Sequence, residues 1–348
     1  MRSVVRFLLR PLPFLLFLLV CGTQASSSAA APQLATQSHP TNRNAVGGST
    51  PSSCEHDKNF DLDDKNKTTR TISLLLARYN LQSSEDDNYG VGVDDQRPQF
   101  HVQGWRWHFM SLVRDSRRLE SLAERVASSY DDEDLVALER AADYVVNFNM
   151  AALFRIQVDL SSKWLRDQLC DEDAVRRIIG EDDDGSSSSD VEVVDALKKL
   201  VDKLDEYRAR SEKMGEQLYT QVKKATTAQS SSKTHHQTKQ LLKDIVNSSA
   251  KFSAQITTMR SLHESLIVPA VSLIVPAKTQ KSFSNKVLLS LGILESRLHL
   301  VGMHDAIAGI EEEERKFGEE IPYIARKMIG GWRKSLYVPK AGALDHGL

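Results

Sequence analysis

The segment from Phe252 to Ala270 (FSAQITTMRSLHESLIVPA) places residues capable of metal chemistry on one predicted helix. Its apolar side chains recur every three or four residues, the spacing of one helical face, and His263 occupies a position within that stripe. Glu264 follows directly, and Pro269 ends the turn. An imidazole on a core-facing stripe beside a carboxylate is either a buried, hydrogen-bonded residue or a metal ligand.

Three further side chains complete the set of candidate metal ligands, namely His108, Asp159 and His304. His108 and Asp159 each lie on an apolar helical stripe, where an unpaired carboxylate would be costly. Interiors of helical bundles hold iron or manganese through His and carboxylate ligands that project inward. The alternative is that His108 and His263 are core residues, that His304 is solvated, and that Glu264 forms a surface ion pair.

The chain lacks the sequence signatures of the common catalytic nucleophiles and phosphate loops. It contains no G-x-S-x-G, C-x-x-C, H-E-x-x-H or P-loop pattern. The formal net charge of −2 provides no basic field for nucleic acid. These observations favour a non-enzymatic protein that has no nucleic-acid partner.

Helical periodicity dominates the second part of the sequence, and almost no stretch alternates as a strand does. The expected helices run roughly over Val102–Ser128, Asp131–Cys170, Val191–Gln229, Gln237–Val268 and Phe283–Gly309, with a further helix from Glu311 that Pro322 breaks. The second is long enough that we expect a kink or break near Ser161–Ser162. The sequence therefore predicts an all-α fold, a four- to five-helix bundle of long helices over 101–338, followed by a tail over 339–348.

The N-terminus has the features of a targeting leader. Three arginines precede the apolar run Leu12–Val20, which is shorter than the roughly 20 residues that a membrane span needs. We interpret 1–25 as a signal peptide and 26–100 as a low-complexity or transit-like, mostly disordered segment. The prediction is the secretory pathway, with no stable membrane span after leader removal; the alternatives are a plastid, reached by a two-part leader, and the mitochondrion.

Several segments resemble hemerythrin-like domains of the HHE cation-binding family. WRWHFMSLVRD places His108 where the first-helix ligand would be, and RSLHESLIVP is similar to a motif of His, an acidic residue and Pro. FNMAALFRIQVDLSSKWLR, at 148–166, is similar to stretches in which a His and an acidic residue bind metal. HLVGMHDAI, at 299–307, resembles the closing His-plus-Asp pair.

The chain departs from the family pattern at expected ligand positions. Phe154 and Arg260 stand about where the family has His, and His299 and Asp305 are one residue further apart than the closing pair usually is. The resemblance therefore implies a divergent, degenerate site with several ligands missing. Such a site would hold one or two iron ions or another divalent metal, or none, and the family implies oxygen or redox sensing.

Two other functions remain open from the sequence. A metal-free structural or protein-interaction bundle is the first, because the helix over 191–229 has charged outer faces suited to a protein partner or a homo-oligomer. A membrane-associated protein is the second, in which LIVPAVSLIVP would act as an interfacial wedge. The alternative for that apolar segment is a buried corner between helices.

Overall fold

A computed structural model describes residues 99–129, 131–179, 188–229, 235–291 and 293–347 of the chain. Contacts within the chain define two compact units, Met1–Asn59 and Phe60–Leu348, and every described residue belongs to the second. The predicted signal peptide, and the segment that follows it as far as residue 98, lie outside the described residues. The described residues form helices and no strands, which confirms the predicted all-α class.

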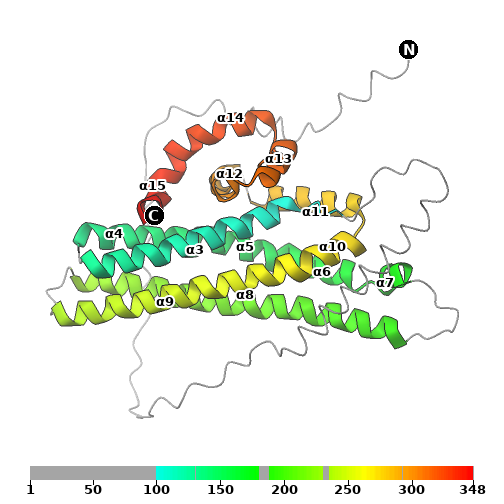
Figure 1. The fold of residues 1–348 in the computed structure, drawn as a ribbon, viewed down its shortest axis with the longest axis horizontal. Helices are drawn as coiled ribbons and strands as arrows, with labels where there is room; N and C mark the ends of the chain where they lie inside the picture. Colours follow the sequence, from blue (N-terminus) through cyan, green and yellow to red (C-terminus); the bar gives the residue numbers. More distant parts are fainter. Residues whose placement is uncertain (1–98, 130, 180–187, 230–234, 292, 348) are drawn as a thin grey trace, which may run out of the picture. The chain divides into compact units, whose positions relative to one another are not determined.

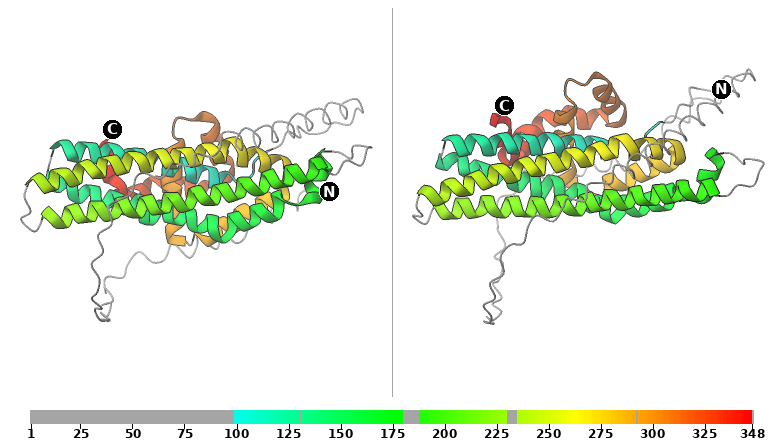
Figure 2. Two further views of the ribbon diagram at one scale, coloured as in Figure 1. Left: turned by 90° about the horizontal axis from the view of Figure 1, so that it is seen from below. Right: turned by 60° about the horizontal axis from the view of Figure 1, so that its bottom comes forward.

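Long helices form the body of this unit. Helix α3 (Gln103–Ser129) packs along α9 (His235–Leu262), and α9 packs along α8 (Ser188–Gln229). Figures 1 and 2 show α3, α8 and α9 running side by side. The apolar stripes predicted for these helices face the core, and their largest fully buried side chains include Trp105, Leu112 and Phe252.

The second predicted helix is a continuous helical run with two π-helical interruptions. It consists of α4 (Asp132–Ala142), η3 (Asp143–Met150), α5 (Ala151–Ile156), η4 (Gln157–Ser161) and α6 (Ser162–Leu169), and α7 (Glu172–Ile179) follows it. At the start, the Asp131 side chain accepts a hydrogen bond from the Glu133 N–H, as an N-cap does. The interruption expected at Ser161–Ser162 takes the form of the π-helical turn η4, where the Ser162 N–H donates to the Gln157 carbonyl.

The last third of the chain is divided into shorter helices than the sequence predicts. After η5 (His263–Ile267) come α10 (Val268–Ile274), α11 (Ala277–Ser290), α12 (Ile293–Ile307), α13 (Glu311–Glu320), α14 (Tyr323–Trp332), η6 (Arg333–Tyr337), α15 (Val338–Ala341) and η7 (Gly342–Gly347). Helix α12 packs against α3, and Figure 1 shows α13 to α15 beyond α3 on the side away from α8.

Two π-helical turns occur directly before prolines. The Val268 N–H donates to the His263 carbonyl just before Pro269, and the Val338 N–H donates to the Arg333 carbonyl just before Pro339. A proline ring clashes with the carbonyl four residues earlier and provides no N–H. The wider turn accommodates the ring without ending the helix, because the hydrogen bond reaches one residue further back.

The apolar segment after His263 is buried. Leu266, Ile267, Val271 and Ile274 are at most 5% exposed, so LIVPAVSLIVP forms an interior corner and not a surface wedge. None of the helices in the described ranges has the length and apolar character that crossing a membrane would require.

The expected tail at 339–348 is helical and packed where it is described. Leu344 is fully buried, and the Asp345 carboxylate accepts hydrogen bonds from Arg118 over 2.8 Å and from Arg333 over 3.0 Å. The end of the chain therefore belongs to the folded unit, and helical packing extends past residue 338.

Candidate functional site

His263 lies in an aromatic enclosure. Its ring centroid is 4.5 Å from that of Trp105, 4.7 Å from that of Phe109 and 6.2 Å from that of Phe100. Neither ring nitrogen has a hydrogen-bond partner among the described residues. Burial, together with the nearby Arg106 and Arg260, lowers the pKa of this imidazole to about 3. His263 is therefore a neutral ring in an apolar setting.

The neighbouring carboxylate of Glu264 faces an arginine. It accepts hydrogen bonds from Arg106 Nε at 2.8 and 3.0 Å, and Arg260 Nε lies 3.8 Å away. Arg106 also donates to Glu313, whose other oxygen accepts from the Trp107 indole over 2.8 Å. Glu264 is thus held in an ion-pair cluster and does not contact the adjacent imidazole.

His108 belongs to a buried polar chain that joins two helices. Its Nε2 lies 2.9 Å from Asn149 Oδ1, and Asn149 Nδ2 donates to Asp115 Oδ2 over 2.8 Å. The carboxylate fixes the orientation of the amide, so the amide oxygen must accept from His108, which then carries its proton on Nε2. Burial lowers the pKa of His108 to about 4, although the bond to Asn149 opposes the shift.

The same chain continues from Asp115 to the C-terminal segment. Arg114 donates to Asp115 Oδ1 from Nε over 2.8 Å and from Nη2 over 2.6 Å, and Nη2 also donates to the Tyr337 hydroxyl over 3.0 Å. Burial raises the pKa of the fully enclosed Asp115 carboxyl, while the Arg114 charge opposes that rise. The chain therefore connects α3, η3 and η6 through hydrogen bonds.

A second imidazole, that of His299, adjoins this polar chain. Its ring stacks on Phe148 at 4.4 Å and lies 4.7 Å from the ring of His108. Its Nε2 has no hydrogen-bond partner in the described part of the chain, and burial holds its pKa well below the usual range. Gly302 lets α12 approach here, because a Cβ would lie 2.8 Å from the Ser111 hydroxyl oxygen and 3.4 Å from that of Tyr144.

The predicted ligands occupy separate surroundings in the structure. His304 is exposed, 3.7 Å from Asp305, while His108, His263 and Glu264 have the partners given above. The Asp159 backbone lies in η4, and its side chain is outside those described. Within the described ranges, no group of three or more His, Cys, Asp or Glu residues is arranged to hold a metal ion. The imidazoles that do lie together are those of His108 and His299.

Sequence reasoning missed a hollow of about 350 Å³ that is lined by arginines. It lies between α3, α9 and the end of α12, and its lining consists of Met110, Val113, Arg114, Arg117, Arg118, Ser121, Arg260, Ala306 and Ile310. The signal was present in the sequence, because Arg114, Arg117, Arg118 and Ser121 recur at the spacing of one helical face. The contribution of Arg260, almost 150 positions later, could not be read from that spacing.

Among the described residues, the arginines in and around the hollow are paired with carboxylates except at Arg117. Ion pairs join five arginines to five carboxylates, namely Arg106, Arg114, Arg118, Arg260 and Arg333 with Asp115, Glu264, Asp305, Glu313 and Asp345. No ion pair or hydrogen bond joins the Arg117 guanidinium to another described residue, and the buried Nη1 of Arg114 lies 4.0 Å from Asp305 Oδ2 without a hydrogen bond. Arg117 is exposed, so the hollow retains one unpaired guanidinium at its surface.

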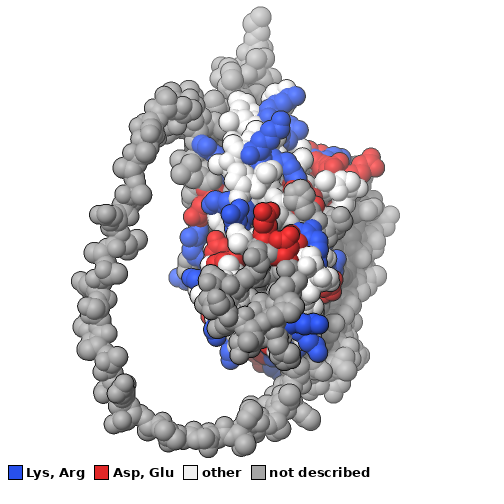
Figure 3. Space-filling model, turned by 90° about the vertical axis from the view of Figure 1, so that its left-hand side faces the viewer, with Lys and Arg blue, Asp and Glu red and all other residues white. Residues whose placement is uncertain are grey.

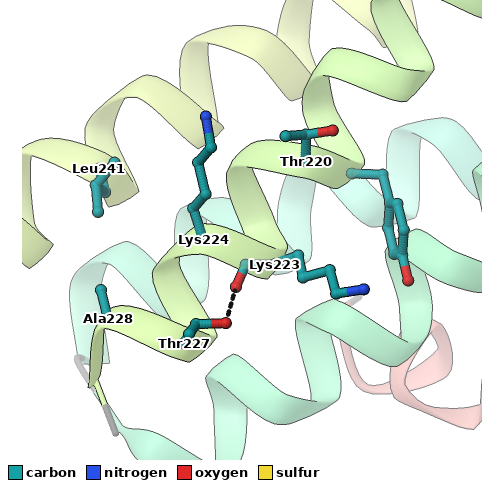
Figure 4. A pocket seen from close by; sticks show the side chains of 7 residues that line it. Thr220, Lys223, Lys224, Thr227, Ala228 and Leu241 are labelled. Carbon is teal, nitrogen blue, oxygen red and sulfur yellow. Dashed lines mark hydrogen bonds between the residues drawn. The ribbon is translucent and has the colours of Figure 1, made fainter. Parts of the chain in front are cut away.

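Not every hollow has such convergence. One of about 510 Å³ lies between α8 and α9, but Figure 4 shows Lys223 and Lys224 pointing in different directions. Its Thr227 hydroxyl donates to the Lys223 carbonyl of its own helix over 2.9 Å. On the end of the molecule drawn in Figure 3, basic and acidic side chains are interspersed, as on an ordinary solvated surface.

No family model, curated protein or solved structure matches the chain. The hemerythrin resemblance therefore stays a prediction from the sequence, and the candidate site rests on the geometry of the described residues.

Proposed function

We propose that the protein is a non-enzymatic helical bundle that binds a small organic anion in the arginine-lined hollow. The observation that supports this proposal is the charge of Arg117, which is left over when the surrounding arginines and carboxylates have paired. An anion bound beside Arg117 would neutralise that charge.

The lining indicates the class of ligand. Guanidinium groups form planar, paired hydrogen bonds with carboxylates and phosphates, so the head group is one of these. Met110, Val113, Ala306 and Ile310 provide an apolar wall, which favours a ligand with a short hydrocarbon body. A volume of about 350 Å³ is at the small end of the range of ligand pockets.

The buried polar chain supports this function as a positioning device. Arg114 lines the hollow, and its side chain is fixed from behind by Asp115 and Tyr337. Asp115 is held in turn by Asn149 and His108. A guanidinium that is already held by two partners loses little freedom when a ligand binds, so the binding geometry is formed in advance.

Unfolding midpoints measured with a panel of anions test the ligand class. Inorganic phosphate, succinate, butyrate and butyl phosphate would be compared with chloride at equal ionic strength, because a ligand that binds only the folded state raises the midpoint. We expect butyrate or butyl phosphate to raise it more than inorganic phosphate does. If Arg117→Gln and Arg260→Gln showed the same rise in midpoint as the parent chain, the proposal would be contradicted. Arg140→Gln, at an exposed site on α4, is the control and should respond like the parent.

Metal binding is a second candidate, which the packing of His108 against His299 favours. The two rings come from α3 and α12, their centroids are 4.7 Å apart, and His299 Nε2 is unpartnered in the described region. We propose this pair as the core of a site with few ligands for iron or another divalent metal. Elemental mass spectrometry after anaerobic loading with Fe(II) tests it: one tightly held ion, lost in His299→Ala, would favour this candidate. A metal content at background would count against it.

A further inference from the structure

Exposed apolar side chains gather at the C-terminal helices. Of the seven large hydrophobic residues that are exposed among the described residues, five lie from Ile310 to Val338. Three of them share one side of α14: Tyr323 is 62% exposed, Ile324 50% and Met328 39%. By contrast, α8 has no exposed large hydrophobic residue among its described side chains. The exposed apolar side chains therefore favour α14 as an association surface.

The two helices at this surface carry opposite charge. Helix α13 has six glutamates against one arginine and one lysine. Residues 321–340, which contain α14, have five Lys or Arg residues and no Asp or Glu. An acidic segment and a basic segment thus adjoin in sequence, with the exposed apolar side chains of α14 next to them.

These opposite charges do not neutralise each other within the chain. The ion pairs of Arg315 join it to Glu312 and Glu319 of its own helix. On α14, the cationic groups of Arg326 and Lys327 lie over the Tyr323 ring, 5.8 and 5.4 Å from its centroid. No ion pair joins α13 to α14 in the described part of the chain. Glu313 pairs with Arg106, and Arg333 pairs with Asp305 and Asp345. The charge left for an external partner therefore comes from the other glutamates of α13 and from Arg326 and Lys327 of α14.

We propose that this face, α13 together with α14, binds the same face of a second copy of the chain. With a two-fold axis passing between the two helices, α13 of one protomer would lie on α14 of the other, twice, and residues near the axis would meet their own copies. The exposed Tyr323, Ile324 and Met328 would then be covered near the axis. Five of the 20 residues of the two helices are buried in the chain itself, so the face is smaller than the roughly 20–30 residues a side of a standard interface, which fits a weak dimer. This inference is independent of the anion site.

Sedimentation equilibrium of the full chain and of charge-reversal variants, over a range of concentrations, tests the proposal. We expect a monomer–dimer equilibrium that weakens as salt is raised. The variant Arg326→Glu/Lys327→Glu and the variant Glu311→Lys/Glu319→Lys should each weaken the dimer by about tenfold or more. Combining all four substitutions should restore most of the affinity, because the two patches are again complementary with their signs exchanged.

Matched variants distinguish this face from the rest of the molecular surface. Lys198→Glu/Lys199→Glu reverses two exposed charges on α8 and should leave the dimer unchanged. Ile324→Asp should weaken the dimer while circular dichroism reports the same helix content. A chain that stays monomeric, a dimer that is lost only in the α8 variant, or a quadruple variant without recovery would each overturn the proposal. A monomer that binds anionic vesicles through Lys327 would likewise overturn it and assign the face to lipid.

Discussion

His108 donates a hydrogen bond from Nε2 to Oδ1 of Asn149, over 2.9 Å, in the interior of the bundle. The imidazole that the sequence marks as a first-helix metal ligand thus serves as the donor at one end of a polar chain. The chain passes from Asn149 to Asp115 and from there to Arg114, which lines the candidate binding hollow. The interior of the bundle and its candidate site are therefore connected through side-chain hydrogen bonds.

Replacing Asn149 with leucine should destabilise the folded state by roughly 2–5 kcal/mol, because it leaves the His108 N–H unpaired and removes one partner of the Asp115 carboxylate. Urea unfolding measures this change. Asn147→Leu is the matched control on the same π-helical segment, since the Asn147 side chain is exposed and donates to Asp143 of its own segment. It should change the unfolding free energy by no more than about 0.5 kcal/mol. Similar values for the two variants would contradict the buried chain.

His263 should make the protein sensitive to acid. The unfolded chain protonates this imidazole below its ordinary pKa of 6.5, whereas the folded chain does so only near about 3. Between these values the unfolded state binds more protons, so the stability present above pH 6.5 is lost as the pH falls, by up to about 1.4 kcal/mol per pH unit. In His263→Leu, the unfolding free energy should fall less steeply between pH 6.5 and 4, by up to about 1.4 kcal/mol per pH unit.

The same variant should be tolerated at neutral pH. Both ring nitrogens of His263 are buried without hydrogen bonds among the described residues, so an apolar side chain of similar size removes a desolvation cost. We expect the stability of His263→Leu at pH 7 to equal or exceed that of the parent chain. Parallel pH profiles for the two proteins, or a large loss of stability at pH 7, would show that the imidazole has a partner or a ligand.

Leu344 provides a test of the C-terminal packing. It is fully buried, so Leu344→Ala should reduce the unfolding free energy by roughly 2–5 kcal/mol, toward the lower end because the chain terminus can relax. Val338→Ala, at a site that is 47% exposed, should have an effect within about 0.5 kcal/mol. Chemical denaturation measures both variants. An unchanged stability for Leu344→Ala would indicate a tail that does not contribute to the fold.

The helices and their buried faces were predictable because both depend on local spacing. Apolar residues recur every three or four positions on one helical face, and Leu112 and Ile256, which belong to such stripes, are fully buried. The π-helical turns before Pro269 and Pro339 were harder to predict from the sequence. The sequence identifies the proline, but whether the helix ends or widens there depends on how the following residues pack.

The sites themselves depend on contacts between distant parts of the chain. Asn149 meets Asp115 from 34 positions away, and Tyr337 meets Arg114 from 223 positions away. Nothing in the local pattern of either partner specifies the other. The sequence could therefore mark His108 and His263 as unusual core residues, but the partners of each ring follow from the packing of α3 against the helices that follow it.

Isothermal titration of the full chain with butyl phosphate and with butyrate, at fixed ionic strength, tests anion binding in the hollow most directly. We expect one site per chain, and a dissociation constant for the tighter probe that rises about tenfold or more in Arg117→Gln, because one charge-assisted hydrogen-bonding group is lost. Arg140→Gln should bind like the parent chain. No measurable heat with either probe, or equal binding by the parent and Arg117→Gln, would contradict the account.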